Sequence, residues 1–169
     1  EGLNLLARSW GETHLEPGDE IALAPQEHHS NFVPWQQLAE RTGARIRWLP
    51  LREDGRLDLE AALEAITERT ALVAVCHVSN VLGVANPVEA LFGRAREIGA
   101  VTVLDGAQSV PHRPVDVDEI GCDALAFSGH KMLGPTGIGA LVVRADLMEE
   151  LAPYETGGGM IDRVSTEGT

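Results

Sequence analysis

Residues 70–76 read TALVAVC, and apart from Thr70 every position in this run is apolar. A strand without regularly spaced polar positions is buried on both of its faces. Both faces of a sheet are covered when helices connect parallel strands, because each crossover helix packs against the sheet. This run therefore favours an α/β fold, in which helices lie on both faces of a mostly parallel sheet.

The segments around this run indicate the same fold class, because strand-like and helix-like patterns alternate along the chain. Helical spacing of apolar residues marks the helices, and Asp58 is a suitable N-cap for one of them. We expect strands at residues 20–24, 45–51, 70–76, 100–104, 122–127 and 138–143. We expect helices at residues 1–14, 32–42, 59–66 and 87–98, and a last helix from Asp146.

The composition limits the partners that such a chain can have. Its 169 residues suffice for one domain, and none of its apolar runs has the length of a membrane span. The formal net charge of −13 argues against nucleic-acid binding and against an anionic membrane surface. Cys76 and Cys122 cannot form a disulfide framework, which favours a cytoplasmic protein. We interpret both cysteines as small buried residues rather than nucleophiles.

Polar side chains of the types that catalysis uses follow four of the expected strands. In parallel sheets, ligands bind beyond the carboxyl ends of the strands. Because the strand interiors hold almost no such residues, we expect the four ends to form one site. The ends carry Glu27, His28 and His29; Ser79 and Asn80; Asp105 and Gln108; and Ser128, His130 and Lys131.

Lys131 stands out because it is the only lysine among 13 lysine and arginine residues. An amine can lose its proton and attack a carbonyl, whereas a guanidinium stays protonated. Lys131 also precedes a loop rich in glycine, where the backbone can approach a ligand closely. It is therefore a candidate for a Schiff base with an aldehyde cofactor, of which pyridoxal phosphate is the common one. The alternative is that a single lysine stands there by chance.

Other strand-end residues fit the needs of the same cofactor. Asp105 could keep the ring nitrogen protonated, or it could be an ordinary helix N-cap. His28 could lie over the ring and move protons, or it could be a solvated loop histidine. Ser128 and His130 could donate hydrogen bonds to a phosphate, although serine at this place often forms a turn.

Two neutral amides and a pair of histidines complete the candidates. Asn80 and Gln108 could bond a phenolate oxygen or a substrate carboxylate. Adjacent His28 and His29 give only weak support for a metal site, because neighbours in sequence rarely bind one ion from a strand end and the chain has no matching Cys/His pair. We therefore expect no metal site.

Four segments of the chain resemble a known family: EHHSNFVPWQQLA, HVSNVLG, LDGAQSVPH and FSGHKMLGPTGIGAL. In order and spacing they are similar to class V aminotransferase-fold enzymes, and most of all to the group II cysteine desulfurases and the related selenocysteine lyases. The resemblance extends over essentially the whole chain. It implies the fold type I architecture of pyridoxal-phosphate enzymes.

The resemblance also implies a role for each matching position. Lys131 would form the Schiff base, Asp105 would pair with the ring nitrogen, Gln108 would bond the phenolic oxygen, His28 would stack on the ring and assist proton transfer, Ser128 and His130 would hold the phosphate, and Asn80 would contact the substrate carboxylate or the ring oxygen. These roles agree with those that the strand ends indicate.

The activity implied by the resemblance is conversion of L-cysteine to L-alanine. The sulfur would pass to an enzyme cysteine and then to a sulfur-acceptor protein for iron–sulfur cluster assembly, in a homodimer. Alternatives on the same scaffold are selenocysteine lyase, kynureninase-like cleavage and a transaminase. A non-catalytic scaffold protein is the alternative from another class.

The chain begins at Glu1 rather than at a methionine, and we expect residues 1–169 to be a fragment, the cofactor-binding core of the large domain. By the resemblance, a phosphate-binding threonine pair would precede Glu1. The persulfide cysteine, the arginine that binds the substrate carboxylate and the small C-terminal domain would follow this chain. The isolated chain is therefore expected to be inactive.

Overall fold

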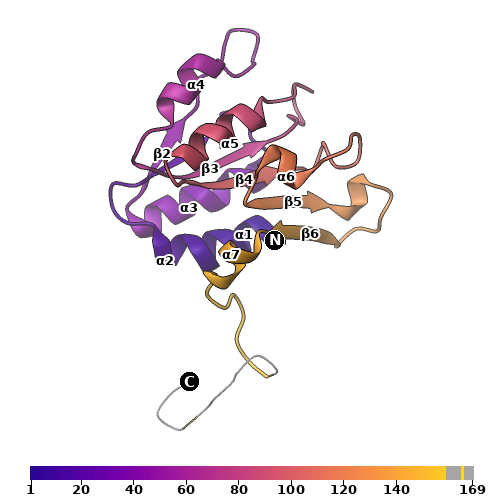
Figure 1. Ribbon diagram of the computed structural model, residues 1–169. Helices are drawn as coiled ribbons and strands as arrows, with labels where there is room; N and C mark the ends of the chain where they lie inside the picture. Colours follow the sequence, from indigo (N-terminus) through magenta and orange to yellow (C-terminus); the bar gives the residue numbers. More distant parts are fainter. Residues whose placement is uncertain (159–164, 166–169) are drawn as a thin grey trace.

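The computed structural model describes residues 1–158 and 165, and its centre is a six-stranded sheet between helices (Figure 1). The order of the strands across the sheet is β2-β1-β3-β4-β5-β6. Neighbouring strands from β2 to β5 run parallel, and only β6 runs antiparallel to its neighbour β5. The strands are β1 (Glu20–Leu23), β2 (Arg45–Trp48), β3 (Thr70–Cys76), β4 (Val101–Asp105), β5 (Ala124–Ser128) and β6 (Gly139–Val143).

Helices cover both faces of this sheet, as the sequence predicts. The segments α1, η1, α3 and α7 pack against one face, and α4, α5 and α6 pack against the other. The helical segments are α1 (Gly2–Leu6), the π-helical η1 (Ala7–Gly11), α2 (Glu12–His14), the 3₁₀ turn η2 (His29–Asn31), α3 (Val33–Thr42), α4 (Leu59–Ala65), α5 (Val88–Glu97), α6 (Val117–Ile120), the 3₁₀ turn η3 (Gly129–Lys131) and α7 (Ala145–Glu149). None of the described helices is both long and apolar enough to cross a membrane.

Strand β3 shows why its sequence is apolar throughout. Leu72 and Ala74 pack into the core on the α1 and α3 side, whereas Val73 and Val75 pack into the core on the α5 side. All four side chains are almost completely buried. Because successive residues of a strand point to opposite faces, a central strand that is covered twice needs apolar residues at every position.

The expected helices and strands are present, and their limits differ where local packing decides. The helix expected at residues 1–14 contains the π-helical turn η1. Gly11 ends this turn, and the side chain of Leu38 from α3 fills the space that a Cβ atom of residue 11 would need. The strand expected at residues 45–51 ends at Trp48, because Pro50 cannot donate to a ladder; Leu51 instead forms an isolated bridge.

The direction of the connections changes between two central strands. From β1 the chain passes to β2 on one side of the sheet and then crosses over to β3 on the other side of β1. Such a switch point leaves a crevice at the carboxyl ends of the strands, where α/β proteins bind ligands. The loops after β1 and β3 begin at this point.

Candidate functional site

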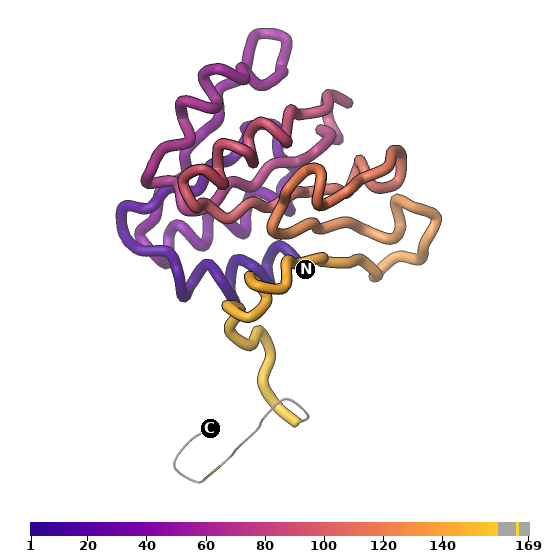
Figure 2. Tube along the Cα trace, in the orientation of Figure 1, coloured from indigo at the N-terminus to yellow at the C-terminus, as the bar shows by residue number. Residues whose placement is uncertain are grey.

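A cavity of about 580 Å³ lies beyond the carboxyl ends of β4 and β5. The β5–β6 hairpin and the first residues of α1 form its other walls, and α1 packs beside β6 although the two are far apart in sequence (Figure 2). Five of the seven residues predicted for the site line this cavity: His28, Asp105, Ser128, His130 and Lys131. The structure therefore brings together residues from three separate strand ends.

Asp105 is the last residue of β4, and its side chain is buried, with 8% of the residue exposed. Its Oδ1 atom accepts a hydrogen bond of 2.9 Å from the Ala107 amide, so the carboxylate also stabilises the turn after the strand. Burial raises the pKa of Asp105, and the hydrogen bond from the Ala107 amide and the positive charge of Lys131 oppose this shift. A carboxylate in this position gains stability from a cationic partner in the cavity.

Lys131 ends the 3₁₀ turn η3, which follows β5 directly. The Gly129 carbonyl holds this turn, because it accepts hydrogen bonds from the Met132 amide at 3.0 Å and from the Gly134 amide at 2.9 Å. Between these two residues Leu133 adopts a φ of 65°, a conformation that is costly for a residue with a side chain. The half-buried Lys131 side chain thus extends into the cavity from a closely hydrogen-bonded turn.

His28 lies in the loop after β1 and its ring is exposed toward the cavity. Its Nδ1 atom accepts a hydrogen bond of 3.2 Å from the Ser30 amide and lies 3.1 Å from the Ser30 hydroxyl oxygen. A backbone amide can only donate, so Nδ1 is an acceptor and the neutral ring carries its proton on Nε2. Nε2 is therefore the ring atom available for a ligand.

Ser128 and His130 line the cavity on either side of Gly129, at the end of β5 and within η3. Ser128 precedes η3 without a side-chain capping bond, so the structure records no turn-forming role for its hydroxyl. A hydroxyl and an imidazole that face one cavity are suitable donors to an anion.

Asn80 and Gln108 are absent from the described residues that line the cavity. Asn80 is exposed in the loop after β3, where the Ser79 hydroxyl accepts hydrogen bonds from the amides of Val81 and Leu82. Gln108 is half-buried in the turn after Asp105. Both residues follow the expected strands, and their roles in the site stay predictions.

Glu27 is a residue near the site to which the sequence reasoning gave no role. It is buried, with 9% of the residue exposed, and its carboxylate accepts hydrogen bonds from Asn31 and from the Cys76 amide. No local pattern in the sequence indicates this environment, because one of the two hydrogen bonds comes from Cys76, which is distant in the chain. Ser30, which lines the cavity, also has no role among the sequence predictions.

The two cysteines are poor nucleophiles in this fold. Burial raises the pKa of the Cys76 thiol far above its ordinary value and that of Cys122 to about 11. Both thiols stay protonated near neutral pH, and the thiolate is the reactive form. The structure also contains no group of three potential metal-ligating side chains among residues 1–158 and 165.

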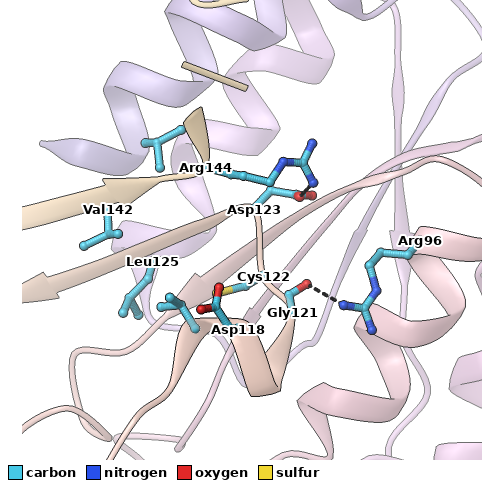
Figure 3. Close-up of a pocket in the computed structure, with 10 residues that line it drawn as sticks. Arg96, Asp118, Gly121, Cys122, Asp123, Leu125, Val142 and Arg144 are labelled. Atoms are coloured by element: carbon cyan, nitrogen blue, oxygen red, sulfur yellow. Dashed lines mark hydrogen bonds and ion pairs between the residues drawn. The ribbon is translucent and has the colours of Figure 1, made fainter. Parts of the chain in front are cut away.

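A second, smaller cavity of about 300 Å³ lies near the start of β5 (Figure 3). Arg144 forms an ion pair with Asp123 there, and Arg96 donates a hydrogen bond to the Gly121 carbonyl. Asp123 also accepts hydrogen bonds from the amide and hydroxyl of Thr102. These contacts join β4, β5 and β6, and none of the predicted site residues lines this cavity.

The sheet is mostly parallel, a lysine lies on the turn after β5, and a buried aspartate ends the neighbouring strand β4. This arrangement defines a class of α/β domains that bind a small molecule at the strand ends. Residues 1–169 match the aminotransferase class-V family, and the chain belongs to this family.

Its curated relatives include cysteine desulfurases. The enzyme of Haloferax volcanii is 52% identical over 99% of this chain, and that of Pectobacterium atrosepticum is 50% identical over 98%. Among solved structures, the cysteine desulfurase CsdA of Escherichia coli superposes with a TM-score of 0.94 at 40% identity over 99% of this chain. The cysteine desulfurase of Thermococcus onnurineus superposes with a TM-score of 0.91 at 44% identity over 99%.

The chain spans about two fifths of the length of these relatives. It covers 39% of the Haloferax volcanii enzyme, 40% of the Pectobacterium atrosepticum enzyme and 42% of each of the two solved chains.

Proposed function

We propose that this chain is the cofactor-binding core of a pyridoxal-phosphate-dependent cysteine desulfurase. The observation that carries the proposal is that Lys131, Asp105 and His28 line one cavity. The full-length protein would convert L-cysteine to L-alanine and pass the sulfur to a cysteine outside residues 1–169. The names of the relatives with about 50% identity support this activity.

The cavity fits pyridoxal phosphate in size and chemistry. Its volume of about 580 Å³ lies within the range of small-molecule sites. The related cystine lyase C-DES, 25% identical to this chain, has been solved with glycine covalently linked to this cofactor. When bound, pyridoxal phosphate supplies an electron-withdrawing ring that stabilises negative charge at the substrate α-carbon.

Each residue of the cavity has a task that its position supports. Lys131 would hold the aldehyde group through Nζ, and as a free amine it would accept the substrate α-proton. Asp105 would keep the ring nitrogen protonated, because a buried carboxylate gains stability from a facing cation. His28 would cover the ring and move a proton through Nε2. Ser128 and His130 would donate hydrogen bonds to the phosphate.

The remaining assignments rest on sequence similarity. Gln108 would bond the phenolic oxygen, and Asn80 would contact the substrate carboxylate or the ring oxygen. Glu1 and Gly2 also line the cavity. The full-length protein acts as a cytoplasmic homodimer and delivers sulfur to an acceptor protein for iron–sulfur cluster assembly.

The test uses the purified full-length protein. We expect visible absorbance from bound pyridoxal phosphate, with alanine and sulfide released from L-cysteine in the presence of a reductant. Lys131→Ala removes this absorbance and the activity, whereas Arg52→Ala, a change on the exposed loop after β2, leaves both intact.

Other results would lead to other functions. Release of selenide from selenocysteine without sulfide from cysteine would make the protein a selenocysteine lyase. Formation of a keto acid would indicate a transaminase, and a protein that binds no pyridoxal phosphate would be a scaffold. A Lys131→Ala protein that keeps the bound-cofactor spectrum would show that the site assignment is wrong.

A further inference from the structure

Glu27 and His28 are neighbours in sequence with opposite environments. The His28 ring is exposed at the cavity, whereas Glu27 is buried and bonded to residues of two other segments. A buried carboxyl group is stable only when hydrogen bonds replace the water that it has lost. Both oxygens of Glu27 meet this need with donors from different elements.

The first donor belongs to the segment that follows His28. Asn31 Nδ2 donates to Glu27 Oε2 over 2.6 Å, and Trp35 Nε1 donates to Asn31 Oδ1 over 3.0 Å. Because the indole can only donate, it fixes the orientation of the Asn31 amide, whose NH₂ group must then face Glu27. Glu27 is thereby connected to η2 and to the first turns of α3.

The second donor belongs to the neighbouring strand. The Cys76 amide donates to Glu27 Oε1 over 2.9 Å. The carbonyl of Cys76 accepts a hydrogen bond of 2.7 Å from Asn86, which in turn accepts one of 2.6 Å from Gln26. Glu27 therefore bridges β1 and β3 at the switch point of the sheet, inside a network of buried polar groups.

This bridge reaches the aspartate of the cavity through the sheet. Cys76 is paired with Asp105 in the register of β3 and β4, and the next amide, of His77, donates to the Asp105 carbonyl over 2.9 Å. The main chain that carries His28 is thus connected to the main chain that carries Asp105 through Glu27. No other described side chain in the loop after β1 accepts hydrogen bonds from both β3 and η2.

We propose that Glu27 is the positioning residue for His28, because its two hydrogen bonds fix the loop that places the imidazole relative to Asp105. The task of His28 rests on the proposed function, whereas the two hydrogen bonds that fix the loop are independent of it. Loss of either hydrogen bond would let the loop after β1 shift. A displacement of about 1 Å at a reacting group can lower a rate roughly a hundredfold.

Glu27→Gln is the informative change, because it keeps the size of the side chain and loses one acceptor. The Cys76 amide can only donate, and Trp35 fixes the Asn31 side chain so that its NH₂ group also donates toward residue 27. The new NH₂ group of the glutamine must therefore face one of these two donors, with which it cannot form a hydrogen bond. Asn31→Ala is the second variant. It leaves the bond from Cys76 to Glu27 in place and removes the other.

Asp123→Asn is the matched control. Asp123 is also a buried carboxylate that accepts from a backbone amide and a side chain, but it lies at the opposite end of the sheet. We expect this variant to lose stability without any effect on His28. It therefore separates a loss of folding energy from a loss of positioning.

The experiment compares the full-length protein with the three variants. In Glu27→Gln we expect kcat for L-cysteine to fall roughly tenfold to a hundredfold with less change in KM, and the visible circular dichroism per bound cofactor to change. We expect the His28 ring resonances to shift in NMR spectra of the same variant. Asn31→Ala should show smaller changes of the same kind, and Asp123→Asn should show none.

Wild-type kcat, circular dichroism and His28 resonances in folded Glu27→Gln and Asn31→Ala would overturn the proposal. Equal changes in Asp123→Asn would do the same, because they would reflect general destabilisation. If the full-length protein binds no pyridoxal phosphate, the proposed function fails separately. The His28 resonances of the cofactor-free variants then still decide whether Glu27 positions the ring.

Discussion

Single carboxylates serve both the fold and the site in this chain. Asp105 accepts a hydrogen bond from the turn after β4 and lines the cavity, so stabilising this turn is compatible with its proposed cofactor role. Glu27 is a second case, because it joins two strands and borders the residue expected over the ring. Burial determines the behaviour of both side chains, because a polar group that has lost its water needs a hydrogen-bond donor or a cation instead.

Asp105→Ala should weaken both cofactor retention and turnover in the full-length protein. Removing one partner of a buried charge pair typically costs about 3–5 kcal/mol. We expect loss of pyridoxal phosphate during dialysis, followed by visible absorbance, and a large fall in alanine formation, followed by amino-acid analysis.

Asp105→Asn is the control for this prediction, because its side-chain oxygen can still accept from the Ala107 amide. It should keep the fold and still lose cofactor affinity. Wild-type retention of pyridoxal phosphate in both variants would contradict the role of Asp105.

Glu27 should make stability depend on pH. Burial raises its pKa from 4.5 to about 8, so between these values the folded state keeps a proton that the unfolded state releases. Its contribution is complete below pH 4.5 and is lost as the pH rises through about 8. Urea unfolding of the cofactor-free full-length protein should therefore show a falling free energy of unfolding between pH 4.5 and about pH 8.

Glu27→Gln cannot titrate, so its free energy of unfolding should fall less over the same pH range. Asp105, whose pKa burial also raises, adds a decline of the same sign that this variant keeps. Identical pH profiles for the variant and the wild type would show that Glu27 does not keep its proton in the folded state.

At the scale of elements, the β5–β6 hairpin places the candidate lysine, Lys131. Ser128 pairs with Gly139 in the antiparallel register, and the Gly129 amide donates to the Ile138 carbonyl over 2.8 Å. The two strands approach closely because glycine occupies the positions where a Cβ atom would meet main chain. The position of Lys131 thus depends on residues without side chains.

Gly139→Ala should destabilise the protein and disturb the hairpin. The added Cβ would lie 2.7 Å from the Phe127 carbonyl oxygen, a main-chain atom that cannot move alone. Overpacking of this kind costs typically about 1–3 kcal/mol. The midpoint of urea unfolding of the full-length protein should therefore fall.

Gly93→Ala is the matched control within α5, where the added Cβ meets no atom within 4 Å. Alanine favours a helix over glycine by about 0.8–1.0 kcal/mol, so this variant should be more stable than the wild type. If the two substitutions shift the midpoint equally, close strand contact is not the cause.

The sequence allowed the sheet to be predicted because a doubly covered strand such as residues 70–76 needs apolar residues throughout. It did not reveal that β6 runs antiparallel, because apolarity carries no strand direction. The feature of the sequence that does indicate an antiparallel β6 is its short link to β5, because a parallel crossover needs a dozen or more residues. The π-helical turn at Ala7–Gly11 depends on contact with α3, which no local pattern in the sequence indicates.

The rule that ligands bind beyond the strand ends brings residues of three strand ends to one cavity, although Gln108, three positions after β4, does not line it. Asp105, Ser128 and Lys131 are placed by β4, β5 and the turn η3, so their convergence follows from the sheet. Asn80 lies in a longer loop whose path depends on tertiary contacts, and it is outside the cavity lining. The burial of Glu27 was not predictable, because it depends on Cys76 and Asn31 together.

At the scale of the whole molecule, the described residues supply an amine, a buried carboxylate and an imidazole, and both of their thiols are held protonated. The chain covers about two fifths of its relatives, and the proposed sulfur-carrying cysteine lies outside residues 1–169. The cofactor core and the sulfur carrier are therefore separate parts of the proposed enzyme.

Cys76→Ala and Cys122→Ala should leave persulfide formation intact in the full-length protein. Their raised pKa values leave little thiolate to attack sulfur. Mass spectrometry after incubation with L-cysteine should find the added sulfur on peptides outside residues 1–169. Loss of that sulfur in the Cys122→Ala variant alone would place the carrier within this chain.

The Gly129 carbonyl, which accepts two amides of the turn around Lys131, also limits how the amine can move. Because the main chain of this turn is held by both hydrogen bonds, the proposed exchange between a cofactor-linked and a free amine would use torsions of the flexible four-carbon stem of the lysine. In the proposed enzyme, side-chain rotation would then return Lys131 to its starting position after each turnover, without a rearrangement of the loop around it.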